Sequence, residues 1–527
     1  MLDMHVGLFT LLKEFDALCR KHGITYYLEG GSLLGAVRHK GFLPWDDDVD
    51  LCITRDNFKK LLSVIDGELP ANRELYCYER FPGYLRDTVK YTNLDSTVIF
   101  PNHILDGNAC GQHIDLFILD PAPSDPEEQE EMKALACVYS ELMTPVYVMC
   151  DDIANHMGTY NHYHRMMEEK GRDYTLNLLR EKLFTREDDE NCDTYLLRWG
   201  NRHVFYKKAF FGEPVEVMFE GHPFPAPSQF YRFLRAEFGD SWMIVPDTAH
   251  QEDHNTFDNY HIPCNVFQAD YTPFINFEKA WDRYSQRKHY NLENLKNKLA
   301  IQRNNAAMQF VLSKIDFEVR LQALSAAQQE MLEKKDYTAL AASFDDYYNA
   351  QIHTEIHRFG MALPVAEPVL YAAALALIMT GRFAEAEKLI RAQGENPSCI
   401  SDRIRDLSMM IADIRSGMLA REEARHAEAY ALAEKWHSRF PLQLNLAAIH
   451  IQKGLLENGD TAALLAETQA LLNTYPGNDT LQMLMGKLLE KEGRQEEADA
   501  YFRSCAKVTR NGLLLMELKS HVGILCE

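Results

Sequence analysis

Residues 30–50 read GGSLLGAVRHKGFLPWDDDVD and join a glycine-rich segment to four aspartates within positions 46–50. From Asp48 the sequence continues DVDLCI, which alternates polar and apolar side chains. This period of two predicts a short strand with Asp48 and Asp50 on one face and the apolar side chains in the core. Two carboxylates about 5 Å apart repel each other by roughly 3 kcal/mol at an effective dielectric of about 20, so a proton or a cation must offset their charge.

The aspartate strand therefore predicts a divalent-metal site. Hard oxygen ligands suit Mg²⁺ or Mn²⁺, which commonly take one or two carboxylates together with substrate phosphates. The alternative is a solvated acidic turn that follows Gly41 and Pro44. A surface turn needs neither the alternation nor the glycine-rich segment before it, so the pattern favours the metal site.

The segment before the aspartates predicts a phosphate-binding helix start. A strand is expected at residues 24–28, and Ser32 can act as the N-cap of a short helix that continues through Val37. Small residues at a helix N-terminus let a phosphate approach the backbone amides, and the helix dipole favours its negative charge. Arg38 follows directly and adds positive charge. Gly-Gly-Ser alone is common in turns, but its place before the aspartate strand favours phosphate binding.

Residues 31–50, which begin with Gly-Ser and end with the Asp48-x-Asp50 pair, resemble the LicD family, whose members have a nucleotidyltransferase-like fold. In that fold a later strand supplies a third carboxylate, and the segment QHIDLFILD at 112–120 offers Asp115. The apolar neighbours of Asp115 would face the core while its carboxylate faces the cleft. The alternative for Asp115 is an exposed position on an edge strand.

The resemblance implies a phosphotransferase. Such an enzyme moves a phospho-alcohol, for example phosphocholine from CDP-choline, to a hydroxyl of a cell-surface glycan, free or lipid-linked, and releases CMP. It implies that Asp48, Asp50 and Asp115 hold Mg²⁺ or Mn²⁺, and that Asp115 or Asp46 accepts the proton of the acceptor hydroxyl. The residues expected to contact the donor's phosphates are Gly31, Ser32, Arg38 and Lys90.

Two other functions stay open at this point. The same metal face would serve a nucleotidyltransferase that releases pyrophosphate from an NTP, and the residues alone do not separate the two reactions. The chain could instead be a scaffold whose transferase domain is inactive. The intact Gly31-Ser32 and Asp48-x-Asp50 patterns argue against an inactive domain.

The resemblance extends to about residue 260, and the whole chain is expected to contain three parts. The first is an α/β or α+β catalytic domain at 1–262, with a helical insertion at about 127–200. The second is a helical connector at 263–345. The third is an all-α domain at 346–527, in which GRFAEAE near its start recurs as GRQEEAD near its end. This third part resembles tetratricopeptide repeats, which predicts a protein partner, although an unrelated helical bundle is the alternative.

The composition excludes some classes of partner. The chain has 527 residues and a net charge of −23, which disfavours binding to nucleic acid. Its 11 cysteines are scattered, which favours reduced thiols. No stretch approaches the roughly 18 apolar residues of a transmembrane segment. We therefore expect a cytoplasmic protein that can also lie at the inner face of the cell membrane.

Overall fold

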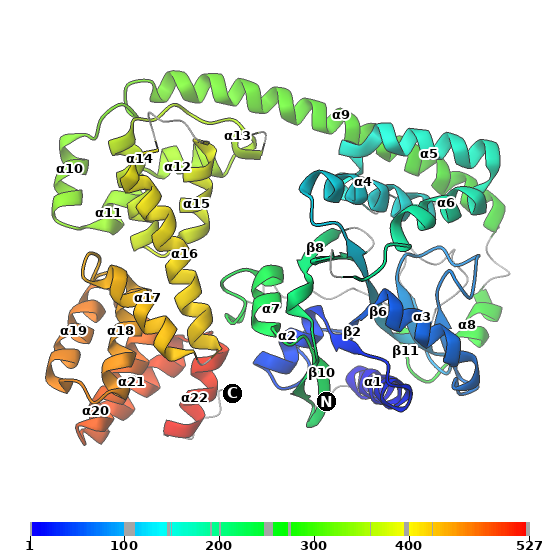
Figure 1. The fold of residues 1–527 in the computed structure, drawn as a ribbon, viewed down its shortest axis with the longest axis horizontal. Helices are drawn as coiled ribbons and strands as arrows, with labels where there is room; N and C mark the ends of the chain where they lie inside the picture. Colours follow the sequence, from blue (N-terminus) through cyan, green and yellow to red (C-terminus); the bar gives the residue numbers. More distant parts are fainter. Residues whose placement is uncertain are drawn as a thin grey trace. The chain divides into compact units, whose positions relative to one another are not determined.

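The computed structural model describes residues 3–99, 111–144, 148, 150–189, 192–199, 202–246, 257–271, 276–358, 360–394, 400–423 and 425–522. The chain divides into two compact units, Met1–Asn297 and Lys298–Glu527. The first unit contains a mixed sheet with helices, and the second consists of helices in its described part (Figure 1).

A mixed sheet organises the first unit, with the strand order β1-β2-β6-β4-β3. These strands are β1 (Tyr26–Leu28), β2 (Asp50–Thr54), β6 (Gln112–Ala122), β4 (Val89–Asn93) and β3 (Arg73–Tyr76). β2 and β6 run parallel, whereas the other pairs in this order are antiparallel. The last residues of β6 pair with β7 (Thr194–Arg198), which pairs in turn with β8 (His203–Lys207). The sheet confirms the mixed α/β character expected of the N-terminal part.

Helices and two short strand pairs surround this sheet. α1 (Asp3–His22) packs on β4 and β6, and its buried Leu11, Leu12 and Phe15 confirm the apolar stripe of an amphipathic helix. The other elements are α2 (Gly30–Arg38), α3 (Arg55–Val64), η1 (Ile65–Gly67), β5 (Thr97–Ile99), η4 (Lys208–Phe210), β9 (Val215–Phe219), β10 (His222–Ala226), α7 (Phe230–Phe238), β11 (Phe257–Asn259) and α8 (Cys264–Tyr271). α2 contacts β2, β9 and α7, so it lies beside the aspartate strand.

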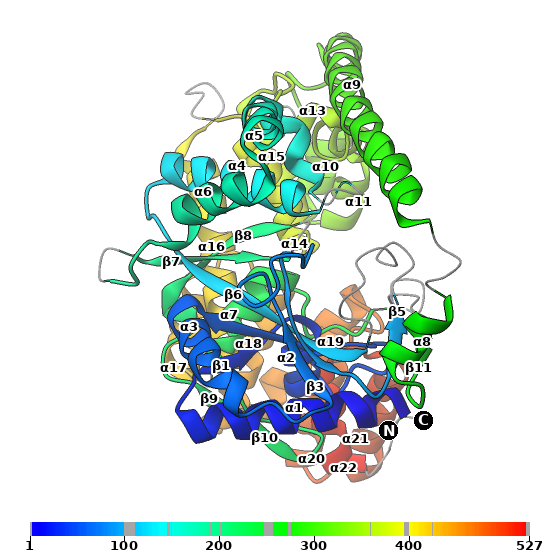
Figure 2. The same cartoon turned by 90° about the vertical axis from the view of Figure 1, so that its right-hand side faces the viewer.

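The segment expected to be a helical insertion is helical only in its first part. α4 (Pro126–Met143), η3 (Asp151–His156), α5 (Met157–Lys170) and α6 (Arg172–Phe184) pack against one another near β7 and β8 (Figure 2). Residues 194–198 then form β7 rather than a helix, because they extend the sheet beyond β6.

α9 (Phe277–Phe317) packs against the end of α4 through a buried lysine. Lys288 is buried, and its Nζ donates to the carbonyl oxygens of Glu141 and Thr144 and lies 3.0 Å from Glu141 Oε2. Leu292 is buried in the same apolar core as α4 and α6. The first half of α9 therefore belongs to the first unit.

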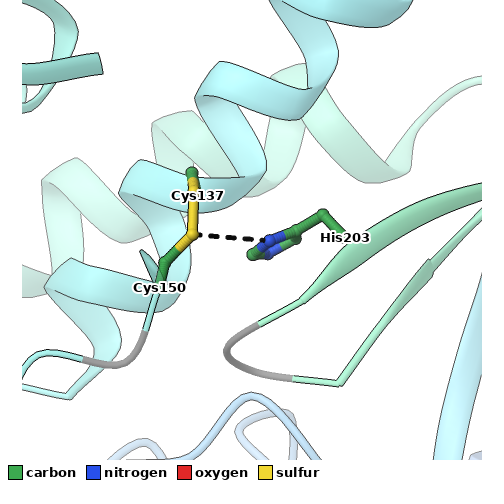
Figure 3. A group of neighbouring side chains, drawn as sticks. All are labelled: Cys137, Cys150 and His203. Carbon is green, nitrogen blue, oxygen red and sulfur yellow. Dashed lines mark hydrogen bonds between the residues drawn. A yellow bond between two sulfur atoms is a disulfide. The ribbon is translucent and has the colours of Figure 1, made fainter. Parts of the chain in front are cut away.

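One cysteine pair departs from the expectation of reduced thiols. Cys137 of α4 and Cys150 form a disulfide, and His203 Nδ1 lies 3.8 Å from Cys150 Sγ (Figure 3). Their Cα atoms lie 6.1 Å apart, within the usual range for a disulfide. The sequence prediction was wrong here because the two cysteines lie 13 positions apart, a spacing that does not reveal their proximity in the fold.

The second unit is built from consecutive helices. They are α10 (Ala326–Glu333), α11 (Tyr337–Ala342), α12 (Asp345–Ile352), α13 (Glu355–Arg358), α14 (Glu367–Met379), α15 (Phe383–Ala392), α16 (Asp402–Glu422), α17 (His426–His437), α18 (Leu444–Leu456), α19 (Thr461–Thr474), α20 (Asp479–Lys491), α21 (Gln495–Val508) and α22 (Gly512–Val522). The two similar motifs lie at the turns of the α14–α15 and α20–α21 pairs. The helical content is confirmed, and the tetratricopeptide assignment stays a prediction. None of the described helices in either unit is both long and apolar enough to cross a membrane.

Gly35 permits a close approach between two backbone segments of the glycine-rich region. A Cβ at this position of α2 would collide with the backbone carbonyl of Gly41. We expect Gly35→Ala to destabilise the protein by about 1–3 kcal/mol, measured by chemical unfolding, because a backbone carbonyl cannot move as a side chain can. Gly158→Ala in α5 is the control, since its Cβ would meet no described atom within 4 Å. Equal unfolding free energies for wild type and Gly35→Ala would contradict the expectation.

Candidate active site

Strand register places three charged side chains in one row across the sheet. Asp50 of β2 is the partner of Asp115 in β6, and Asp115 is also the partner of Lys90 in β4. Directly paired residues of neighbouring strands project from the same face of a sheet. The structure thus brings together three residues that the sequence analysis proposed separately.

The remaining aspartates lie just before this row. β2 begins at Asp50, so the prediction that Asp48 lies in this strand is wrong. The regular pairing of β2 with β1 begins at Leu51, which is the partner of Leu28. Asp46, Asp47 and Asp48 nevertheless bring one carboxylate oxygen each within 4.8 Å of one another. The aspartates of residues 46–50 therefore form one cluster at the start of the strand.

The carboxylate cluster has the charge and chemistry that a hard divalent cation needs. Burial, together with the negative charges of Asp48, Glu29, Asp115 and Asp46, raises the pKa of Asp50 well above its ordinary value. The raised pKa of Asp50 means that full ionisation of the cluster costs free energy in the folded protein. A divalent cation would offset that charge, and the donor atoms are all carboxylate oxygens. The residues present fit Mg²⁺ or Mn²⁺.

Lys90 and His113 surround the third carboxylate of the row. Lys90 Nζ donates to Asp115 Oδ1 at 2.6 Å and lies 2.6 Å from His113 Nε2, while His113 Nδ1 lies 2.8 Å from the carbonyl oxygen of Gly111. Burial alone would raise the pKa of Asp115, but the Lys90 ammonium holds it below its usual range. Burial and the charge of Lys90 lower the pKa of His113 to about 4, so this imidazole is neutral near pH 7. A neutral His113 accepts from Lys90 through Nε2 and donates to Gly111 through Nδ1.

The start of α2 differs from the expected capping. The helix begins at Gly30 with Glu29 in the N-cap position, so the prediction that Ser32 caps it is wrong. Ser32 Oγ instead accepts the backbone N–H of Asp50 at 3.0 Å, which ties the helix to the start of β2. A Cβ on Gly31 would collide with the Asp46 carboxylate. The glycine-serine pair therefore holds α2 directly against the aspartate cluster.

Arg38 is held away from the start of its helix. Its side chain is buried at the end of α2, and Nη1 donates to the carbonyl oxygens of Trp242 at 2.9 Å and Ile244 at 3.1 Å. Burial lowers the pKa of Arg38 to about 10. These contacts fix the segment after α7 against α2, and phosphate binding by Arg38 stays a prediction.

Two acidic residues of the site were missed by the sequence analysis. Glu29 is fully buried, its Oε1 has no hydrogen-bond partner among the described residues, and burial with the charge of Glu237 raises its pKa well above the ordinary value. Burial raises the pKa of Glu237, on α7, to about 8. An acid at the end of the apolar strand sequence YYLEG could have indicated Glu29. The position of Glu237 depends on a helix far along the chain, which no local pattern predicts.

Comparison with known proteins relates part of this chain to a family. Residues 23–105 match the family described as LicD/FKTN/FKRP, nucleotidyltransferase domain. The lipopolysaccharide cholinephosphotransferase LicD of Haemophilus influenzae is 27% identical over 270 residues, which cover 47% of this chain and 94% of that protein. The ribitol 5-phosphate transferase FKRP of Homo sapiens and that of Mus musculus are each 68% identical over 31 residues, only 6% of this chain and 6% of each relative. The N-terminal part of the chain therefore carries a LicD-family nucleotidyltransferase domain.

Proposed function

We propose that the protein transfers a phospho-alcohol, such as phosphocholine, from a CDP-activated donor to a hydroxyl of a cell-surface glycan and releases CMP. The observation that carries the proposal is the row of Asp50, Asp115 and Lys90 beside the glycine start of α2. The similarity to a cholinephosphotransferase, which spans 94% of that relative and 47% of this chain, supports the reaction class.

Asp48, Asp50 and Asp115 are the residues that would hold Mg²⁺ or Mn²⁺ in this proposal. When bound, the cation would neutralise charge on the phosphates of the donor. Gly31 and Ser32 form the first turn of α2, whose amide groups and dipole favour a phosphate there. Asp46 belongs to the aspartate cluster and lies against Gly31 at the start of α2. It can therefore take the proton of the acceptor hydroxyl.

We expect Lys90 to affect both the KM for the donor and the affinity for the divalent cation. We expect Lys90→Met to raise the KM for the donor about tenfold, because a charge-assisted contact to phosphate is lost. The same variant should bind Mg²⁺ or Mn²⁺ more tightly, because the ammonium no longer competes for Asp115 Oδ1. Steady-state kinetics and Mn²⁺ titration measure the two effects.

Lys59→Met is the control for Lys90→Met, since Lys59 is an exposed lysine that pairs with Asp56 on α3. Both quantities should be unchanged in this control. Weaker cation binding by Lys90→Met would contradict the proposed competition for Asp115.

The test of the reaction is product analysis with a panel of donors. CDP-choline, CDP-ribitol and, separately, an NTP are incubated with the full chain, Mg²⁺ and candidate glycans, and CMP and pyrophosphate are measured. CMP that depends on one CDP-alcohol and on an acceptor supports the proposal. Pyrophosphate released from an NTP, or no product from folded protein that binds Mn²⁺, would overturn it.

A further inference from the structure

The first turn of α1 contacts both segments that carry the carboxylates of the candidate site. His5 Nε2 donates to the carbonyl oxygen of Asp46 at 2.8 Å, at the start of the aspartate cluster. The carbonyl oxygen of Met4 accepts from Gln112 Nε2 at 2.8 Å. Gln112 is the first residue of β6, the strand that carries Asp115. One helical turn is therefore bonded both to the aspartate segment and to the strand of the third carboxylate.

His5 is held in place by its ring as well as by this hydrogen bond. The side chain is buried, and its imidazole stacks on Phe42 with centroids 4.1 Å apart and planes 4° apart. The ring of Phe42 packs in turn against Phe219 of β9, with centroids 4.8 Å apart. The stack fixes the plane of the imidazole, and hydrogen bonds are directional, so the Nε2–H group can hold the backbone of Asp46 in one place.

Gln112 connects the same turn of α1 to the sheet. A Cβ on Gly7 would collide with Gln112 Oε1, so this glycine lets the amide group lie on the surface of the helix. The backbone of Gln112 is paired with Asn93 of β4, and its N–H donates to Ser96 Oγ at 2.9 Å. The side chain is therefore bonded to α1 while the backbone belongs to β6. The position of α1 fixes the start of β6 through this residue.

These contacts matter because regular strand pairing fixes only part of the candidate site. The register of β2 and β6 places Asp50 beside Asp115, but β2 begins at Asp50 and the aspartates of residues 46–48 lie before it. Mg²⁺ requires a nearly ideal arrangement of its oxygen ligands, so a displaced carboxylate weakens its binding. The aspartates outside the strand need another support, and His5 bonds to the first of them.

We propose that His5 and Gln112 are positioning residues, through which the first turn of α1 sets the distance between the aspartates of residues 46–48 and Asp115. The inference rests on the cation-binding role proposed above for the carboxylates. Neither side chain has to contact the cation or a substrate. His5 acts through the backbone of Asp46, and Gln112 acts through the strand that carries Asp115.

The test separates the hydrogen bond of His5 from its ring stack. His5→Phe keeps a flat ring on Phe42 but loses the donor, whereas His5→Gln keeps an amide donor in place of Nε2 but loses the ring. Gln112→Leu removes the amide that reaches Met4. Mn²⁺ titration, steady-state CMP release and thermal unfolding are measured on the full chain for each variant.

Two control variants carry the same substitutions away from the candidate site. His22→Phe lies at the other end of α1, where His22 Nε2 is 2.9 Å from Glu68 Oε1. Gln129→Leu removes an amide of α4 that donates to the carbonyl oxygen of Pro123 at 2.7 Å. Both controls should bind Mn²⁺ and release CMP as the wild type does.

His5→Phe and Gln112→Leu should each bind Mn²⁺ about three- to tenfold more weakly than the wild type, the effect of one lost hydrogen bond. Their kcat for CMP release should fall by a similar factor, while the KM for the acceptor stays unchanged. His5→Gln should keep the Mn²⁺ affinity of the wild type, although loss of the stack lowers its unfolding temperature.

The opposite pattern overturns the inference: Mn²⁺ affinity kept in His5→Phe and lost in His5→Gln would mean that the ring only fills space. Equal affinities in the wild type, His5→Phe and Gln112→Leu overturn it too, as does a wild type that binds no Mn²⁺. Failure of the proposed reaction gives a different result. Mn²⁺ affinity would then depend on His5 and Gln112 as expected, but no CDP-alcohol would yield CMP.

Discussion

Asp50→Asn should reduce kcat/KM for phospho-alcohol transfer by about 10³-fold, the effect of losing several kcal/mol of charge stabilisation at the phosphates. The amide keeps the shape of the side chain but removes the charge at the centre of the carboxylate cluster. The free energy of unfolding, in contrast, should not fall. Because burial and neighbouring carboxylates raise the pKa of Asp50 in the folded state, its ionised form opposes folding above that pKa. The metal-free variant should therefore unfold at the same or a higher temperature than wild type near pH 7.

Asp56→Asn is the matched control for Asp50→Asn. Asp56 lies on α3, just after β2, and its side chain is 69% exposed. The same substitution there should leave transfer and stability unchanged. CMP release by Asp50→Asn within a few-fold of wild type would remove Asp50 from the metal-binding role, whereas loss of activity together with a lower unfolding temperature would indicate a structural role.

Asp120→Asn should destabilise the first unit by about 2–3 kcal/mol, because two buried guanidinium groups lose the carboxylate that they share. Among the described residues, Arg198 then keeps only Asp87 as a counter-charge, and Arg55 keeps only Glu79. Asp120 is fully buried on β6, where its carboxylate accepts from Arg55 at 2.7 and 3.0 Å and from Arg198 at 3.3 Å. Neither guanidinium can reach bulk water, since both arginines are buried. Urea unfolding followed by tryptophan fluorescence measures the loss.

Asp66→Asn breaks a comparable ion pair at the surface and serves as the control. Asp66 pairs with Arg80, and its side chain is 82% exposed. Such pairs contribute at most about 1 kcal/mol, so the control should unfold near the wild-type midpoint. Equal unfolding free energies for Asp120→Asn and Asp66→Asn would show that water reaches the buried arginines.

The sequence indicated most residues of the candidate site but did not predict how they meet. The alternation after Asp48 and the segment around Asp115 each indicated a strand, but only long-range pairing shows that Asp50 and Asp115 are direct neighbours. Ser32 was assigned the wrong partner, because helix-start patterns do not reveal that its hydroxyl meets the backbone of β2.

Contacts between distant segments explain what the sequence did not predict. Glu237 comes from a helix about two hundred residues after Glu29. His437 and Glu467 lie on different helices, α17 and α19, although His437 Nε2 is 3.4 Å from Glu467 Oε1. Side chains that meet in this way leave no periodic signal in the chain, so only the three-dimensional packing shows them.

The contacts of Lys288 in α9 with the end of α4 determine where the first unit can be separated for experiments. A fragment that ends at residue 262 would lack Lys288, whose ammonium lies beside Glu141 Oε2 and donates to the carbonyl oxygens of Glu141 and Thr144. Glu141 Oε1 would keep the backbone N–H of Cys150. Loss of the cationic partner of a buried carboxylate commonly costs several kcal/mol, a large part of the stability of a domain. Truncation after Asn297 keeps Lys288 and Leu292 with the core that they complete. The extent of the folded first unit, rather than the end of the segment that resembles the family, thus sets the shortest fragment for purification.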